Sequence, residues 1–269
     1  MEWCGRSLRQ TRLGNSLGVL PVQMPGELAL GLLARARVRS AERGLDAVVA
    51  LGRPLGIEAR QSAAHAGTLL MVSGFGGSTR GLGPMLRSAE RDGINAVGVA
   101  IPGGGLDSVH AGVRALDDAI AQVPTGPLHL AGHSKGGIVI QEWWRTAAPQ
   151  QRARVESMTL ISSSSTGQKL GRMQRLQMAA LWPVTGPLTS SIMEASARNP
   201  VMQRIGKLNI PRSVRSMSII STGDKLMSVD EATWKGARMM VLDGPQSHME
   251  TLIAADAYAA LRDNVLGRT

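Results

Sequence analysis

From residue 67 to the end of the chain, short apolar runs alternate with amphipathic segments. Six runs have the composition of buried strands: residues 68–72, 95–101, 127–131, 155–161, 216–220 and 238–242. Segments with helical spacing of apolar residues lie between and after them, near 80–92, 107–123, 135–148, 229–236 and 249–266. Alternating strands and helices predict a parallel sheet that helices cover on both faces. We therefore expect an α/β fold, a three-layer α/β/α sandwich around a mostly parallel six-stranded sheet.

Two stretches of the chain do not follow this alternation. From about residue 26 to 49, apolar positions recur at helical spacing among arginines, which predicts a helical extension at 1–66 ahead of a core at 67–269. Residues 166–214 separate the fourth and fifth strands by far more chain than a crossover needs, which predicts an inserted helical lid. Within this insertion, Lys169, Arg172 and Arg175 run beside an apolar stripe.

The composition limits the class of protein. The chain has 269 residues, 43% of them hydrophobic and 19% charged, which is enough apolar material for a core and excludes a disordered chain. No stretch approaches the roughly eighteen consecutive apolar residues of a membrane-spanning helix, which excludes a polytopic membrane protein. A single cysteine, Cys4, excludes an internal disulfide and a zinc site built from cysteines alone.

Positive charge is concentrated in one part of the chain. The formal net charge is +10, and residues 166–215 contain eight basic residues against one acid, Glu194. This excess predicts peripheral contact with an anionic membrane surface, with an ordinary solvated helix face as the alternative. The chain has five Trp, one Tyr and one Phe, too few aromatic residues for a surface that stacks bases, so we expect no nucleic-acid partner.

A nucleophile elbow is the most informative motif. Ser134 stands in the pattern Gly132-x-Ser-x-Gly136, between an expected strand and an expected helix. Small residues are needed on both sides of the serine because the strand and the helix nearly touch at such a turn. The alternative is a glycine-rich turn without chemistry.

A serine nucleophile needs a general base, and a carboxylate that orients this base. Elbow enzymes order these residues as serine, acid, histidine, and His248 is the only histidine after Ser134. It lies in a loop just beyond the sixth strand, and the alternative is a surface histidine. The four remaining histidines are interpreted as structural, namely His65, His110, His129 and His133.

Asp224 is the preferred acid because it directly follows the fifth strand. Asp230 and Glu231 have a competing explanation, since Ser228 begins a capping box that favours acids in a first helical turn. Asp243 is the second choice, and could instead be a turn residue.

The tetrahedral intermediate of acyl transfer needs backbone N–H donors for its oxyanion. One donor is expected from Lys135, the residue after the nucleophile, and the other from Phe75 in the glycine-rich loop after the first strand. A phosphate-binding loop is the alternative, but the loop has neither a dinucleotide fingerprint nor a P-loop lysine.

Taken together, residues 73–78, residues 132–136, Asp224 and His248 resemble the α/β-hydrolase superfamily, most closely its bacterial lipases and esterases. The resemblance implies a Ser-Asp-His triad, half of an oxyanion hole from the first loop, and a lid from the insertion. Many members carry His-Gly where this chain has Ser73-Gly74. Because the chain before the first strand has a helical pattern, we expect a reduced, six-stranded version of the fold.

These residues favour a carboxylic ester hydrolase that forms an acyl-enzyme on Ser134 from a small-molecule or lipid ester. An acyltransferase or thioesterase could use the same three residues, and a non-catalytic membrane-binding or partner-binding protein on a hydrolase scaffold is a further alternative. No pair of histidines has metal-ligand spacing on a common helix, so we expect neither a metal nor a cofactor. The oligomeric state stays open, as does the choice between a cytoplasmic, a membrane-peripheral and a secreted location.

Overall fold

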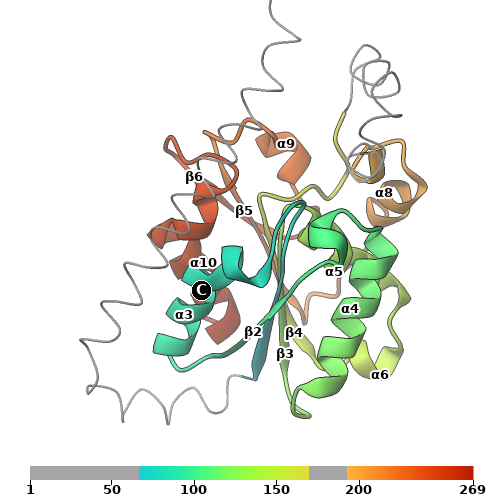
Figure 1. Cartoon of the computed structure of the whole chain (residues 1–269), viewed down its shortest axis with the longest axis vertical. Helices are drawn as coiled ribbons and strands as arrows, with labels where there is room; N and C mark the ends of the chain where they lie inside the picture. The colour runs from blue at the N-terminus through green and yellow to red at the C-terminus, as the bar shows by residue number, and fades with distance from the viewer. Residues whose placement is uncertain (1–66, 170–192, 269) are drawn as a thin grey trace, which may run out of the picture.

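A computed structural model describes residues 67–169 and 193–268 of the chain (Figure 1). The expected N-terminal extension at 1–66 lies outside the described residues, and so do residues 170–192 of the expected lid and Thr269.

Six parallel strands form one sheet in the order β2-β1-β3-β4-β5-β6. Their bounds are β1 Thr68–Val72, β2 Asn95–Val99, β3 Leu128–His133, β4 Val155–Ile161, β5 Arg215–Ser221 and β6 Arg238–Leu242. The prediction of a six-stranded parallel sheet is confirmed, and all of the described strands run parallel.

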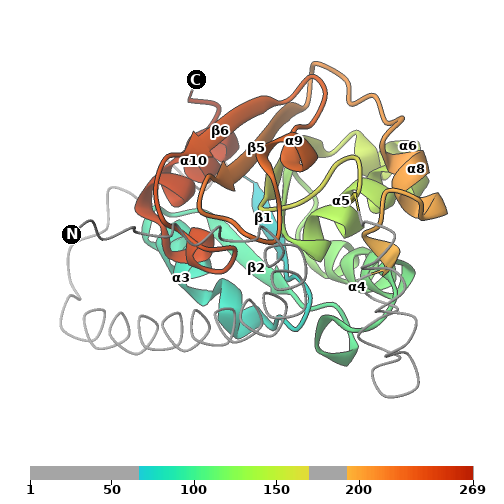
Figure 2. The ribbon, with the colours of Figure 1, turned by 90° about the horizontal axis from the view of Figure 1, so that it is seen from above.

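Helices cover both faces of this sheet (Figures 1 and 2). One face carries α3 (Thr79–Arg91) and α10 (Ala255–Leu266), and the other carries α4 (Val109–Gln122), α5 (Lys135–Thr146) and α8 (Pro200–Ile205). The shorter helical elements are η1 (Gly103–Gly105), α6 (Pro149–Arg152), α9 (Val229–Ala232) and η2 (Glu250–Ile253). The predicted three-layer α/β/α arrangement is confirmed.

Two expected helices are shorter than their sequence pattern. The segment 229–236 is helical only as far as Ala232, because Thr233 is extended and Trp234 turns into the core, where it is 5% exposed. The segment 249–266 divides into η2 and α10 at Ala254, whose backbone is extended at φ −73° and ψ 126°. Tertiary contacts have overridden the helical periodicity at both places.

The strands at the centre of the sheet are buried on both faces. In β1, Leu70 and Val72 pack into the apolar layer below α4 and α5, and Leu69 and Met71 pack into the layer below α3 and α10. Alternate residues of a strand point to opposite faces, so a strand that is covered twice must be apolar at every position. This explains why the expected strands are continuous apolar runs.

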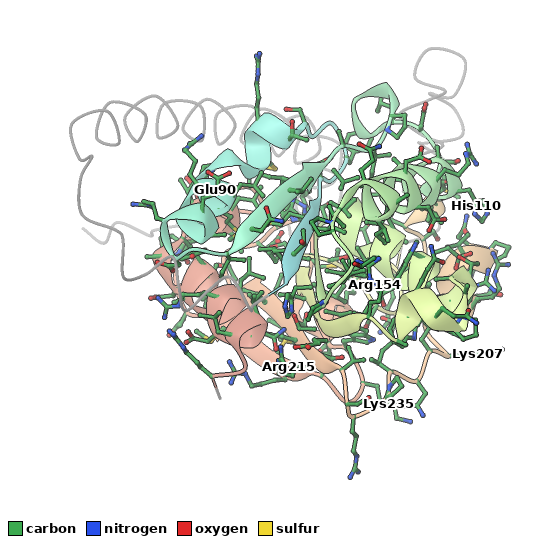
Figure 3. All side chains as sticks on the ribbon, turned by 90° about the horizontal axis from the view of Figure 1, so that it is seen from below. Glu90, His110, Arg154, Lys207, Arg215 and Lys235 are labelled. Carbon is green, nitrogen blue, oxygen red and sulfur yellow. The ribbon has the colours of Figure 1, made fainter. Side chains whose placement is uncertain are left out.

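At the amino-terminal edge of the sheet, arginine side chains bind backbone carbonyls. Arg154, just before β4, donates to the carbonyl oxygens of Gly126 and Pro124, and Arg215 donates to those of Asn264 and Val265 (Figure 3). The carboxyl ends of the strands meet at the opposite edge, which is where parallel α/β sheets carry their sites.

The buried Trp143 of α5 joins this helix to α4. It is completely buried, and its Nε1–H donates to Asp117 Oδ1 at 2.6 Å. We expect Trp143→Phe to lower the free energy of unfolding by about 1–3 kcal/mol, since it loses this hydrogen bond and part of a filled core volume. Urea denaturation measures the change. Asp117→Asn keeps the acceptor oxygen and is expected to cost less; an equal or larger loss would contradict this account of the contact.

Candidate active site

The turn between β3 and α5 holds Ser134 in a strained conformation. Its backbone lies at φ 54° and ψ −123°, one of two positive φ angles among the described residues other than glycine. Such a conformation costs on the order of 1–3 kcal/mol and persists only where the surrounding structure enforces it. Ser134 is partly exposed, so its hydroxyl is raised at the carboxyl edge of the sheet.

The glycines around Ser134 are required by close backbone contacts. A Cβ atom at Gly132 would collide with the backbone of Gly136, and one at Gly136 would collide with the carbonyl oxygen of Val72 in β1. The elbow is thus packed against both its own helix and the neighbouring strand. This contact is the physical reason for the Gly-x-Ser-x-Gly spacing.

The structure brings His248 and Asp224 together at this edge. His248 Nδ1 lies 2.8 Å from Asp224 Oδ2, and both residues are buried, at 9% and 8% exposure. Asp224 is a carboxylate acceptor, so His248 donates through Nδ1–H and Nε2 is left as the basic nitrogen. These are the two residues that the chain order had selected as acid and base.

Further donors hold the Asp224 carboxylate in place. Its Oδ1 accepts the N–H groups of Leu226 and Met227 at 2.9 and 3.0 Å, and the Ser162 hydroxyl also bonds to the Asp224 carboxyl group. Burial opposes ionisation of this carboxyl, but the His248 imidazole and these hydrogen bonds together hold the pKa of Asp224 below its usual value. The group is therefore ionised at neutral pH and can stabilise an imidazolium.

Ser134 and His248 come from adjacent parts of this edge. His133, the residue before Ser134, has its ring centroid 4.9 Å from that of His248. Of the hydrogen bonds in the described part of the chain, none joins the Ser134 hydroxyl to His248. Catalytic hydrogen bonds are often long in ligand-free enzymes and tighten when substrate binds, so this looser geometry is compatible with a serine nucleophile.

The glycine-rich loop after β1 lies directly against the elbow. A Cβ atom at Gly74 would sit 2.8 Å from Ser134 Cβ and 2.9 Å from the His133 carbonyl oxygen, so only glycine permits this approach. Phe75 follows in the same turn, and its N–H has no acceptor among the residues that the structure describes. The loop therefore lies against the serine, and the role of the Phe75 N–H as an oxyanion donor stays a prediction.

His133 is buried beneath this arrangement. Its Nε2–H donates to the backbone carbonyl oxygen of His248 at 3.0 Å, which fixes the loop that carries His248 to the elbow that carries Ser134. Burial, together with the neighbouring His248, lowers the pKa of His133 to about 3. The ring is neutral at physiological pH and serves as a hydrogen-bond donor.

The remaining sequence candidates lie away from this cluster. Asp243 is exposed after β6, and no hydrogen bond to His248 is present. Glu231 bonds to Ser228 in a capping box at the start of α9, as expected. His129 is buried in β3 and bonds to Ser157, and His110 is exposed on α4.

The sequence analysis did not identify the residues that hold Asp224 and His248 in position. Ser162, which bonds to Asp224, has a positive φ of 45° at the end of β4, and its hydroxyl also reaches Thr251 at 3.3 Å. A signal was present: Ser162 begins a run of four serines directly after a buried strand, at the edge where the elbow lies. Nothing in the sequence indicated the hydrogen bond from His133 to the backbone carbonyl of His248.

The basic excess of residues 166–215 is not all directed toward this edge. Arg215 lies at the amino-terminal edge (Figure 3), where it also pairs with Glu156 at 3.4 Å. Arg172 and Arg175, which carry the expected membrane contact together with Lys169, lie outside the described residues.

Comparison with solved structures identifies the fold. The described architecture is the α/β-hydrolase fold in a reduced, six-stranded form. A lipase-esterase related protein from Clostridium acetobutylicum ATCC 824 is similar with a TM-score of 0.50 and 16% identity, over 74% of this chain and 93% of that one. Est1E from Butyrivibrio proteoclasticus has a TM-score of 0.52 and 12% identity, over 75% and 88%.

Aspergillus fumigatus lipase B has a TM-score of 0.56 and 16% identity, over 73% of this chain but only 51% of its own. No family model matches the chain, and no curated protein sequence matches it. At these identities the likeness concerns the fold alone.

Two features are absent from residues 67–169 and 193–268. No three His, Cys, Asp or Glu side chains gather there as they would around a metal ion. None of the helices in these ranges has the length and apolar content needed to cross a bilayer.

The low pKa of His133 predicts a pH dependence of stability. An unfolded chain protonates this ring below about pH 6.5, whereas the folded protein keeps it neutral down to about pH 3. Between these values the unfolded state binds one more proton, so the free energy of unfolding falls by about 1.4 kcal/mol per unit as the pH drops. We expect His133→Asn to remove this contribution.

Urea denaturation between pH 4 and 6 measures the slope for the wild type and the variant. His110→Asn, at the exposed histidine of α4 (Figure 3), is the matched control and should keep the wild-type slope. If His133→Asn also kept that slope, the neutral buried ring would not be the cause.

Proposed function

We propose that the protein is a serine hydrolase of carboxylic esters that works through an acyl-enzyme on Ser134. The observation that carries this proposal is the hydrogen bond between His248 and Asp224, formed at the same sheet edge as a serine held in the strained conformation of a nucleophile elbow. A structural glycine turn would need neither the buried carboxylate nor the oriented imidazole.

In the first half of the reaction, His248 Nε2 removes the proton of the Ser134 hydroxyl while the oxygen attacks the ester carbonyl carbon. The carbonyl oxygen takes the negative charge, which the N–H groups of Phe75 and Lys135 stabilise. Asp224 stabilises the imidazolium that forms. The tetrahedral intermediate collapses, His248 returns the proton to the leaving alcohol, and the acyl-enzyme remains.

In the second half, a water molecule gives a proton to His248 and attacks the acyl-enzyme. The second tetrahedral intermediate uses the same oxyanion donors, and its collapse restores the Ser134 hydroxyl with the proton from His248. The products are the carboxylic acid and the free enzyme. Neither half requires a metal or a cofactor.

For the insertion at 166–214 we propose a lid role, in which it would shape the acyl pocket. A lid flanked by Lys169, Arg172 and Arg175 would favour acyl chains presented at an anionic interface. The described part of the insertion contributes α8, whose Val201 and Met202 pack into the core on the α5 face.

The test is hydrolysis of p-nitrophenyl esters from acetate to palmitate, together with labelling by a fluorophosphonate probe. We expect Ser134→Ala, with an unchanged circular dichroism spectrum, to lower kcat by about 10⁴-fold or more and to abolish labelling. The acyl-length optimum then distinguishes an esterase from a lipase pocket. A folded wild-type protein that neither turns over an ester nor reacts with the probe would refute the proposal.

The choice of acid gives a second prediction. Asp224→Asn should lower kcat by about 10³–10⁴-fold, because an amide cannot hold the imidazole in the required tautomer or stabilise its charge. Asp243→Asn, at the exposed aspartate after β6, should leave kcat within about two-fold of the wild type. Both are measured with the best p-nitrophenyl ester, and the reverse ranking of the two variants would reassign the acid.

A further inference from the structure

Lys135, the residue after Ser134, has a buried side chain whose partners lie far away in the sequence. The side chain is 4% exposed, its Nζ lies 2.7 Å from Glu194 Oε2, and it donates to the carbonyl oxygen of Asp107 at 2.6 Å. Lysine is almost never buried to this extent unless it is paired. Its ammonium group therefore joins three segments: the elbow, the loop before α4, and the chain that follows residue 192.

Glu194 is held from a second side. Both of its carboxylate oxygens lie 3.2 Å from the N–H of Val109, the first residue of the 14-residue helix α4. A carboxylate is favoured there by the unpaired N–H groups and by the dipole of the helix. The position of Glu194 is thus fixed by an ion pair and by a helix terminus.

Glu194 also belongs to the stem of the insertion. Gln168 and Ser196 form a parallel β-bridge, in which the Gln168 N–H donates to Ala195 at 2.7 Å and the Ala197 N–H donates to Gln168 at 2.9 Å. The bridge therefore joins the chain before residue 170 to the chain after residue 192, two residues from Glu194. We call the bridged residues 168 and 194–197 the stem of the insertion. A displacement of this stem would move the Glu194 carboxylate that pairs with Lys135.

The loop that contains Asp107 packs against the loop that carries Phe75, the second expected oxyanion donor. Gly105, two residues earlier, has φ +85°, and a Cβ there would lie 2.7 Å from the Gly76 N and against the Gly74 carbonyl oxygen. The loop that Lys135 holds by its Asp107 carbonyl is thus packed on the loop that carries Phe75. One ammonium group restrains the surroundings of both expected oxyanion donors.

We infer that Lys135 is a positioning residue, whose side chain aligns the N–H groups of Lys135 and Phe75 and couples this alignment to Glu194 at the stem of the insertion. The inference rests on the proposed function. Oxyanion donors act only within about 2.7–3.1 Å of the developing charge, so a small displacement of either donor slows the chemical step. Loss of the ion pair should therefore lower kcat and leave KM nearly unchanged.

The first variant is Glu194→Gln, which keeps the size of the side chain and an acceptor for Val109 but removes the charge. With a short p-nitrophenyl ester we expect kcat to fall about ten-fold or more, with KM within about two-fold. The rate of fluorophosphonate labelling should fall in parallel, because phosphonylation uses the same oxyanion donors. A thermal melt reports whether the fold is intact.

Glu231→Gln is the matched control. Glu231 is also a carboxylate at the base of the insertion, where its oxygens accept from the N–H of Lys169 and from the N–H of Ser228. Its kcat should stay within about two-fold of the wild type. An equal fall in both variants would indicate a general loosening of the insertion and would overturn the inference.

A double-mutant cycle with Lys135→Met separates positioning from general destabilisation. If the ion pair acts as one unit, the double variant should lose no more kcat than either single variant. Additive losses, or an unchanged kcat in Glu194→Gln, would overturn the inference. Glu194→Asp, which keeps the charge but shortens the reach, replaces Glu194→Gln if that variant does not fold, and an unchanged kcat in it has the same meaning.

The activity of the wild-type protein separates a failure of the proposed function from a failure of this inference. Absence of turnover and labelling in the wild type would refute the proposed function and this inference together. An active, labelled wild type with an unaffected Glu194→Gln variant would refute the inference alone.

Discussion

The close approach of three backbone segments at the elbow is the constraint on which the site depends. The end of β3, the start of α5 and the end of β1 come so near to one another that Gly132 and Gly136 have no room for a side chain. The same contacts hold Ser134 at a positive φ, and the strain is compensated by the buried sheet around it. A rigid parallel sheet, with its core on both faces, is what makes such a position stable.

Around this point, the site is built from the ends of several strands. Ser134 follows β3, Ser162 follows β4, Asp224 follows β5, and His248 lies in the loop after β6. Each loop is tied to another by a buried hydrogen bond: His248 to Asp224, Ser162 to Asp224, and His133 to the backbone of His248. The order of the strands across the sheet thus converts distant sequence positions into one connected network, and buried networks of this kind are rigid when every member is satisfied.

The ion pair of Lys135 and Glu194 extends that network to the insertion. The sequence already marked Glu194 as the one acid among eight basic residues in 166–215, but nothing in the pattern indicated its partner. In the structure, the carboxylate reaches the residue next to the nucleophile and the start of α4 at the same time. A segment that we propose as a lid is therefore connected to the centre of the site by charge as well as by the chain.

The sequence by itself determined the layers, the six strands and the turn that raises Ser134, because apolar runs and glycine spacing are local consequences of burial and backbone geometry. It also ranked Asp224 above Asp243 from the end of a strand alone. Only the tertiary structure decided where the helices predicted at 229–236 and 249–266 end. The positions of Trp234 and of the loop that carries His248 are set by packing and not by the local periodicity of the sequence. The tertiary structure also decided the partners of His133, Ser162 and Lys135, because contacts between residues 59 to 115 positions apart depend on how the loops meet at one edge of the sheet.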